Sequence, residues 1–220
     1  MKILSMGLFV SMALVAMSSW AQSYNQPLKR EGTREATFLI NYMGSFDIEG
    51  KGGSGVDVSD DVGWGFGLGY NYDNHWNLSF VLDSNNSNYR ATYIGEDGDV
   101  KNIRHSLSTY SGQFNAQYNF SEGALTPFVQ AGLGWTYIDS NVSNSTENGW
   151  CYNDPWYGYR CYTSTYDDNS FSYNAAVGIR WDIGRTMFVR GTYGLRWLDI
   201  GGARSTPEMA IGSFEIGSRF

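Results

Sequence analysis

Two cysteines and a dense group of aromatic residues are the most distinctive reactive features of this 220-residue sequence. Cys151 and Cys161 are its only cysteines, and ten positions separate them. In an oxidising compartment such a pair forms a disulfide, and closing so short a loop stabilises it by on the order of 3 kcal/mol. Metal binding by two cysteines without a nearby histidine is disfavoured. We therefore expect a disulfide between Cys151 and Cys161 and no metal site.

The segment around the cysteines offers a candidate binding surface. Trp and Tyr side chains provide large contact areas at a small entropic cost. The candidate residues are Trp150, Trp156, Tyr157 and Tyr159. They could stack on sugars or pack on a protein partner. The alternative is that the rings pack on one another and on the rest of the molecule, as an extended hairpin.

Nucleophilic catalysis would need a histidine base beside a serine, with an acid that orients the histidine. The histidines are His75 and His105, and Ser106 and Ser108 follow the second of them. Serines are so frequent in this chain that this spacing carries no information. We expect no enzyme activity and no cofactor.

The composition argues against a nucleic-acid partner and favours a surface that faces lipid. The formal net charge is −7, whereas phosphate binding needs a basic surface. Charged residues make up 17% of the chain and aromatic residues 16%, and an ordinary soluble domain has about 25% charged residues. Low charge with many Tyr and Trp is typical of a barrel whose outer face meets lipid between aromatic belts.

The N-terminus has the pattern of a cleaved secretory signal over residues 1–21. Lys2 supplies the positive charge, an apolar run follows over 3–17, and Ser19 and Ala21 are small residues at a cleavage site. The alternative, a membrane anchor, is disfavoured because the run is shorter than the roughly 20 residues of a spanning helix. Residues 22–34 then form a short periplasmic lead-in, and 35–220 form one domain.

Eight segments in that domain alternate apolar and polar residues with a period of two, which predicts strands. The apolar stripes run over 36–46, 62–72, 76–82, 110–120, 129–137, 171–181, 187–197 and 214–220. None of the stripes contains a charged residue, which would cost roughly 2–4 kcal/mol in the middle of a lipid-facing surface. A soluble β-sandwich would instead place polar residues outside. The pattern predicts an all-β fold, an eight-stranded antiparallel up-and-down transmembrane β-barrel.

The connections alternate between short and long. Tight turns are expected at 73–75, 121–126 and 182–186, and longer loops near 47–61, 84–105, 139–170 and 199–208. Short periplasmic turns with long extracellular loops are the usual asymmetry. The loop that holds both cysteines is therefore expected outside the cell, where an extracellular ligand or the surrounding lipopolysaccharide is its expected partner.

The chain ends in an alternating strand. Phe214, Ile216 and Phe220 occupy one face, and Glu215 the other. A last strand that found no partner would leave an open edge, and a closed barrel pairs it with the first strand. We expect its aromatic face to meet lipid beside Phe38 and the rest of the first strand.

The chain resembles the small eight-stranded outer-membrane barrels of the OmpA-like and OmpX-like family over residues 35–220. The resemblance rests on the strand count, the loop asymmetry, the segment at 126–135 and the terminal Phe220. It implies the outer membrane of a Gram-negative-type bacterium. It also implies that Phe214, Ile216 and Phe220 are a signal for the barrel-assembly machinery.

Three charged residues fall on the inward faces of successive strands near the periplasmic end: Arg180, Arg190 and Glu215. A lone buried charge is costly, so we expect these residues to form an ion-pair network. Eight strands leave an interior that side chains can fill, which favours a permanent plug over a gate. The inward glycines of the second strand, at 63, 65, 67 and 69, are expected to receive bulky groups from the opposite wall, including Arg180.

These features lead to one expected function and one alternative. We expect a monomeric, non-enzymatic outer-membrane barrel with a role in envelope structure or in surface interaction through its extracellular loops. The alternative is a narrow pore for small solutes or ions.

Overall fold

The computed structural model describes residues 29–49, 55–94, 100–143, 150–154, 158–162, 165–199 and 206–220. The expected signal at 1–21 and the start of the lead-in lie outside these ranges. No helix in the described part of the chain is long and apolar enough to cross a membrane.

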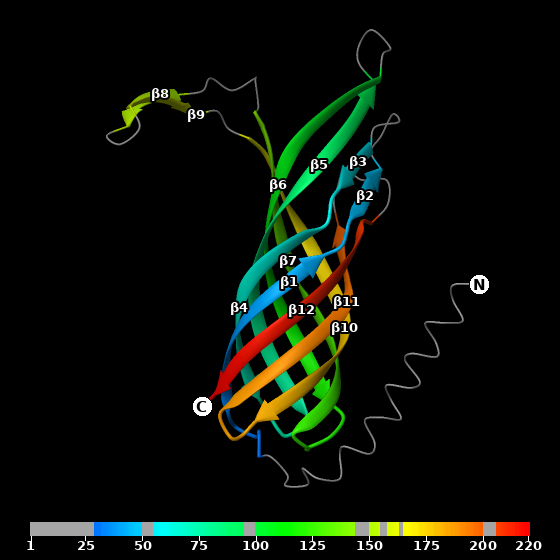
Figure 1. The fold of residues 1–220 in the computed structure, drawn as a ribbon, viewed down its shortest axis with the longest axis vertical. Coiled ribbons are helices and arrows are strands. Elements are labelled where there is room, and N and C mark those ends of the chain that lie inside the picture. The colour runs from blue at the N-terminus through cyan, green and yellow to red at the C-terminus, as the bar shows by residue number, and fades with distance from the viewer. Residues whose placement is uncertain are drawn as a thin grey trace, which may run out of the picture.

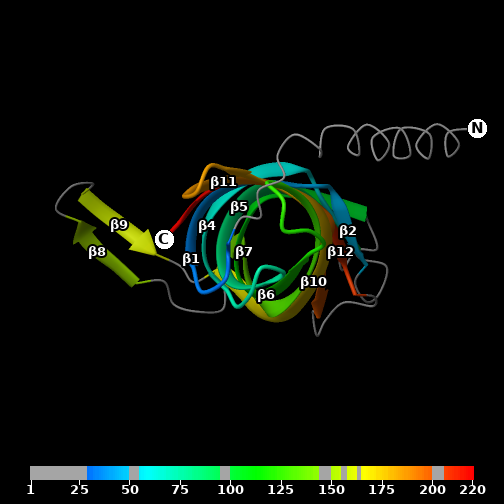
Figure 2. The ribbon, with the colours of Figure 1, turned by 90° about the horizontal axis from the view of Figure 1, so that it is seen from below.

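Eight antiparallel strands close into a barrel, which confirms the predicted fold (Figures 1 and 2). They are β1 (Arg34–Met43), β4 (Asp61–Asn71), β5 (Trp76–Ile94), β6 (Val100–Asn119), β7 (Leu125–Ser143), β10 (Thr165–Ile183), β11 (Met187–Asp199) and β12 (Glu208–Arg219). Each pairs with the next of these in the chain, and β12 pairs with β1. We call the end with the short turns, expected to be periplasmic, the lower end, and the opposite end the upper end, as they stand in Figure 1.

The last strand closes the barrel against the first, as the terminal strand predicts. Phe38 lies opposite Ile216, and Ile40 lies opposite Phe214. The amide of Phe220 donates to the carbonyl of Arg34 at 3.0 Å, and the amide of Arg34 donates back at 2.9 Å. The last residue of the chain is thereby tied into the closed sheet.

Four shorter strands extend the upper end. β2 (Phe46–Glu49) pairs with β3 (Gly55–Val58), which pairs with the upper part of β5. β8 (Trp150–Asp154) and β9 (Gly158–Tyr162) form a separate two-stranded sheet.

The prediction of a loop over residues 84–105 is wrong in large part, because β5 and β6 stay paired as far as Ile94 and Val100. Backbone pairing continues above the lipid, where the outer face meets water and no longer needs apolar residues. The apolar alternation therefore marks only the part of the strands that lies in the membrane.

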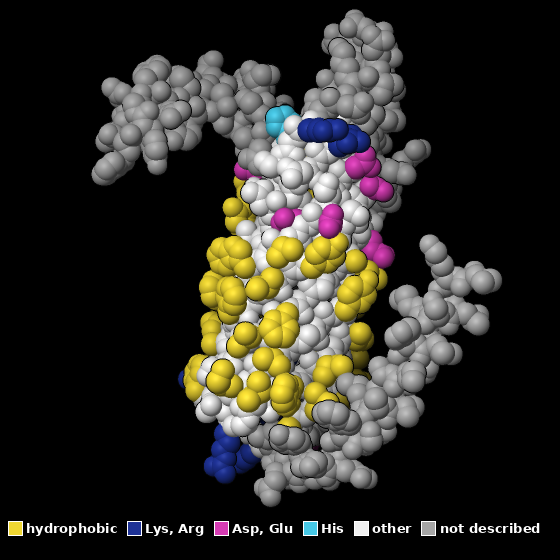
Figure 3. Space-filling view, in the orientation of Figure 1, with side chains coloured by type: hydrophobic (Ala, Val, Ile, Leu, Met, Phe, Trp, Pro, Cys, Tyr) yellow, Lys and Arg dark blue, Asp and Glu magenta, His cyan; other side chains and the backbone are white. Residues whose placement is uncertain are grey.

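A belt of apolar side chains crosses the face of the barrel shown in Figure 3, and all eight barrel strands contribute exposed apolar residues. Three aromatic residues at its upper edge donate hydrogen bonds to exposed carboxylates. The pairs are Tyr42 with Asp60 at 2.9 Å, Tyr137 with Asp167 at 3.0 Å and Trp197 with Glu208 at 3.1 Å. Aromatic rings with one polar atom suit the boundary between lipid and water, so these pairs mark that boundary.

A second apolar cluster lies inside the upper end, and we call it the upper apolar core. Its buried members are Met43, Phe46, Val58, Tyr89, Leu107, Leu198 and Met209. The sequence analysis placed Phe46 on the outer stripe, which is wrong. Gly44 and Ser45 separate β1 from β2, and this break shifts the alternation by one residue and turns Phe46 inward.

Candidate functional site in the barrel lumen

Charged side chains from the segment before β1 and from β1, β10, β11 and β12 meet in the lower half of the lumen. We call this set the lower charge cluster. Its members, all buried, are Arg30, Glu35, Arg180, Asp182, Arg190, Glu215 and Arg219. Alternate residues of a strand share a face, so the strands bring these side chains to the lumen while their neighbours face lipid.

The three residues singled out in the sequence lie in this cluster. Arg190 Nη2 is 2.7 Å from Glu215 Oε2, and Arg180 Nη2 is 2.7 Å from Glu35 Oε1. Glu35 Oε2 also lies 3.8 Å from Arg190 Nη1, which links the two pairs. Arg180 further pairs with Asp182 at 2.9 Å.

An aromatic ring packs against the two lumen arginines. The guanidinium of Arg180 lies 4.1 Å from the ring centre of Phe188, and that of Arg190 lies 5.1 Å away. A desolvated cation over an aromatic face is favourable. Phe188 is fully buried, so this contact helps to fill the lumen as well as to hold the charges.

Arg30, which the sequence analysis did not single out, closes the lower mouth. Its side chain is 0% exposed and its Nη2 lies 2.7 Å from Asp182 Oδ2. It also donates to the carbonyls of Ser121 at 3.0 Å and Gly123 at 2.7 Å, in the turn between β6 and β7. Burial lowers the pKa of Arg30, and the charge of Asp182 opposes this.

A second ion pair crosses the lumen higher up. Arg196 Nη2 lies 2.9 Å from Asp83 Oδ2, and Nη1 donates to Ser111 Oγ at 2.8 Å. The upper apolar core begins at the level of this pair, because Met209 lies opposite Arg196 in the β11–β12 ladder and Leu198 lies two residues further up β11. Charged and apolar layers therefore succeed one another along the lumen.

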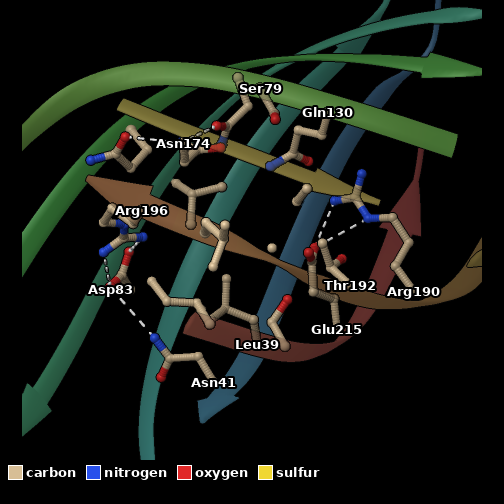
Figure 4. Close-up of a pocket in the computed structure, with 18 residues that line it drawn as sticks. Leu39, Asn41, Ser79, Asp83, Gln130, Asn174, Arg190, Thr192, Arg196 and Glu215 are labelled. Atoms are coloured by element: carbon tan, nitrogen blue, oxygen red, sulfur yellow. Dashed lines mark hydrogen bonds and ion pairs between the residues drawn. The ribbon is translucent and has the colours of Figure 1, made fainter. Parts of the chain in front are cut away.

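A cavity of about 70 Å³ lies between the two charged layers (Figure 4). Its lining includes Ser79, Gln130 and Thr192, with Arg190 and Arg196 at its two ends. One water needs about 10–15 Å³ of such space, so the cavity is large enough to hold ordered water. Apolar side chains, among them Leu39, Val81 and Leu195, complete the lining of this chamber.

The inward glycines of β4 do accommodate other side chains, but not those expected. Neighbouring strands fill the space: Asn41 and Asn85 lie against Gly63, and Asp83 against Gly65. Arg180 pairs with carboxylates instead. Side chains on adjacent strands are nearer than those across the barrel, and the glycines leave room for them.

The structure places the two cysteines directly opposite each other in the β8–β9 ladder. Opposite residues of an antiparallel pair have Cα atoms about 4.5–5.5 Å apart, within the range that a disulfide spans. The register is thus compatible with the bond, which stays a prediction. Trp150 and Tyr159 lie in the same ladder, whereas Trp156 and Tyr157 lie outside the described residues.

The two histidines lie at opposite ends of the molecule. His75 is in the turn between β4 and β5, where its Nδ1 is 2.7 Å from the carbonyl oxygen of Asn119. Its Nε2 lies 3.5 Å from Glu122. His105 lies in the upper part of β6 and is exposed. The structure therefore does not bring the two histidines into one site.

Comparison with known proteins agrees with this architecture. Residues 8–217 match the family model described as the outer membrane protein beta-barrel domain. No curated protein that was compared with the chain matches it in sequence.

Solved outer-membrane barrels have a similar fold. The outer membrane protein OprG from Pseudomonas aeruginosa is 12% identical with a TM-score of 0.54, over 89% of this chain and 99% of that one. Neisserial surface protein A is 12% identical with a TM-score of 0.49, over 86% of this chain and 98% of that one. The N-terminal barrel domain of OprF from Pseudomonas aeruginosa is 14% identical with a TM-score of 0.46, over 86% and 98%. At these identities, the likeness to OprG indicates a shared fold and no more.

Proposed function

Since this chain belongs to the outer membrane protein beta-barrel domain family, we propose that it is a closed, monomeric and non-enzymatic barrel. It stabilises the envelope and does not conduct solutes. It interacts with partners through its upper extension, by which we mean the upper parts of β5 and β6 together with β8 and β9. The observation that carries this proposal is the filled lumen, in which the lower charge cluster and the upper apolar core lie on either side of one small chamber.

The energetics of the lower charge cluster favour a permanent plug. Separating a buried ion pair leaves an uncompensated charge in the protein, which costs several kcal/mol. Arg180 and Asp182 each contact more than one oppositely charged group. Opening a path would require several such pairs to separate together, so a closed lumen is the stable state.

The upper extension is the part that reaches furthest from the membrane. β5 and β6 continue beyond the aromatic edge, and β8–β9 presents the paired cysteines with Trp150 and Tyr159 in the same ladder. We propose that these elements contact lipopolysaccharide or an extracellular partner. The outward face of Phe214, Ile216 and Phe220 supports their proposed role in recognition by the barrel-assembly machinery.

Conductance in planar lipid bilayers tests the closed barrel. The unmodified protein is expected to give no steady current. A double variant, Arg30→Ala with Arg180→Ala, removes much of the plug and is expected to conduct, which shows that inserted barrels are detectable.

Arg34→Ala, which removes an exposed arginine near the same mouth, is the control and should stay silent. Steady currents from the unmodified protein would contradict the proposal. They would favour the alternative, a narrow pore through the central chamber.

A further inference from the structure

Two exposed arginines face the outside directly opposite each other in the upper part of the β5–β6 ladder. Arg90 pairs in register with Arg104. Like charges directly opposite each other on a sheet are destabilising. Among the described residues, neither guanidinium has a hydrogen bond or ion pair. In the part of the chain that the structure describes, these two adjacent positive charges therefore form no ion pair.

A surface groove includes both arginines. It is also lined by the polar residues Ser59 and Asn88 and by one carboxylate, Asp57. His105 borders it from the other face of the sheet, where its ring lies beside that of Tyr89. Asp57 lies opposite Arg90 in the β3–β5 ladder, but the two form no ion pair among the described residues. Guanidinium, hydroxyl and amide groups all donate hydrogen bonds. The groove therefore has the chemistry of an anion site.

The height of the groove above the apolar belt indicates which class of anion can reach it. Arg104 lies six residues beyond Tyr110, whose partner Tyr137 marks the upper edge of the apolar belt. At about 3.3 Å per residue and a tilt of about 40°, that places the arginine about 15 Å above the edge. Figure 3 shows basic side chains gathered at this height, above the belt. The phosphorylated sugars of an outer leaflet also lie above its acyl chains, on the same side of the apolar belt as the groove.

We propose that Arg90 and Arg104 bind a phosphate group on the sugars of the lipopolysaccharide around the barrel. The proposal rests on the proposed outer-membrane function. Each guanidinium offers a planar fork of donors that matches phosphate oxygens. A phosphate between the two arginines replaces their repulsion by two charge-assisted contacts.

Binding of fluorescently labelled lipopolysaccharide to the full-length protein in detergent tests this site. The double variant Arg90→Gln with Arg104→Gln is expected to bind about tenfold or more weakly, because it loses charge-assisted hydrogen bonds. The matched control, Arg34→Gln with Arg185→Gln, removes two exposed arginines at the lower end and is expected to bind as the unmodified protein does.

Two ligand comparisons distinguish the source of the phosphate. Dephosphorylated lipopolysaccharide is expected to bind the unmodified protein as weakly as intact lipopolysaccharide binds the double variant. Inorganic phosphate at millimolar concentration is expected to compete poorly. Equal binding of intact and dephosphorylated lipopolysaccharide would overturn the proposal, as would tight binding of inorganic phosphate alone or an equal loss in the control variant.

Thermal unfolding supplies a second readout, which a merely structural role would not give. Without lipopolysaccharide, the double variant is expected to melt at the same temperature as the unmodified protein or higher, because a repulsion is removed. With lipopolysaccharide, the unmodified protein is expected to melt at a higher temperature than the double variant. A lower melting temperature in both conditions would overturn the proposal. The substitutions leave the lumen unchanged, so bilayer conductance still tests the closed barrel separately.

Discussion

At the scale of single residues, the lumen shows how a barrel tolerates buried arginines. Each arginine of the lower charge cluster has a carboxylate partner, and Asp182 contacts Arg30, Arg180 and Arg219. Buried charges are stable when they are paired and hydrogen-bonded. Arg30 is distinctive because its partners are also backbone carbonyls of the turn between β6 and β7, so one side chain joins the lead-in to that turn.

Removing the Arg30 side chain tests whether it holds the lead-in against the turn between β6 and β7. Arg30→Ala is expected to lower the free energy of unfolding by about 2 kcal/mol, because charge-assisted hydrogen bonds are lost while Asp182 keeps other partners. Urea unfolding in detergent, followed by the mobility difference between folded and unfolded barrels on gels, gives this value. Arg34→Ala is the control, expected within about 0.5 kcal/mol of the unmodified protein. Equal stability of the two variants would contradict the assignment.

At the scale of elements, the turn between β4 and β5 depends on one carboxylate. Asp73 Oδ1 accepts from the amides of Trp76 at 2.6 Å and His75 at 2.7 Å. These hydrogen bonds lower the pKa of Asp73. Because the folded pKa is the lower one, the stabilisation is fully present above the unfolded value of about 3.9 and is lost as the pH falls through the folded value.

This sign gives a pH prediction for the turn. The difference in unfolding midpoint between the unmodified protein and Asp73→Asn is expected to be constant above about pH 5 and to shrink below about pH 4. Unfolding measured across pH 2–7 gives the two curves. A difference that stays constant, or that widens in acid, would show that the ionised carboxylate does not stabilise the turn.

The inner wall formed by β4 and β5 depends on a close approach of two backbones. A β-carbon added at Gly65 would overlap the carbonyl oxygen of Leu82 and crowd Asp83. Because the first obstacle is backbone, it cannot be relieved by turning a side chain.

Alanine at this position tests that constraint. Gly65→Ala is expected to lower the free energy of unfolding by about 1–3 kcal/mol, the usual cost of overpacking, measured by urea unfolding. Gly191→Ala is the matched control within a strand, since a β-carbon there would meet nothing within 4 Å. A similar loss in both variants would contradict crowding as the cause, since the entropy of the unfolded chain alone favours alanine over glycine.

At the scale of the whole molecule, closure and filling are separate properties. The pairing of β12 with β1 removes the open edges of the sheet, as membrane insertion requires. The interior is then occupied by charged layers below and apolar residues above. The expected absence of conductance follows from the filling, whereas stability in lipid follows from the closure.

The sequence alone determined the strand order, the outer face and the location of Arg180, Arg190 and Glu215 on the inner one. Lipid imposes a strict period-two pattern on every strand that crosses it, and that pattern is local. Only the tertiary structure decided what lies beyond the lipid or across the lumen. The upper strand extensions and the inward turn of Phe46 escape the pattern because no lipid constrains them. Arg30 joins the lower charge cluster, and Arg90 meets Arg104, through contacts between segments that closure and register alone bring together.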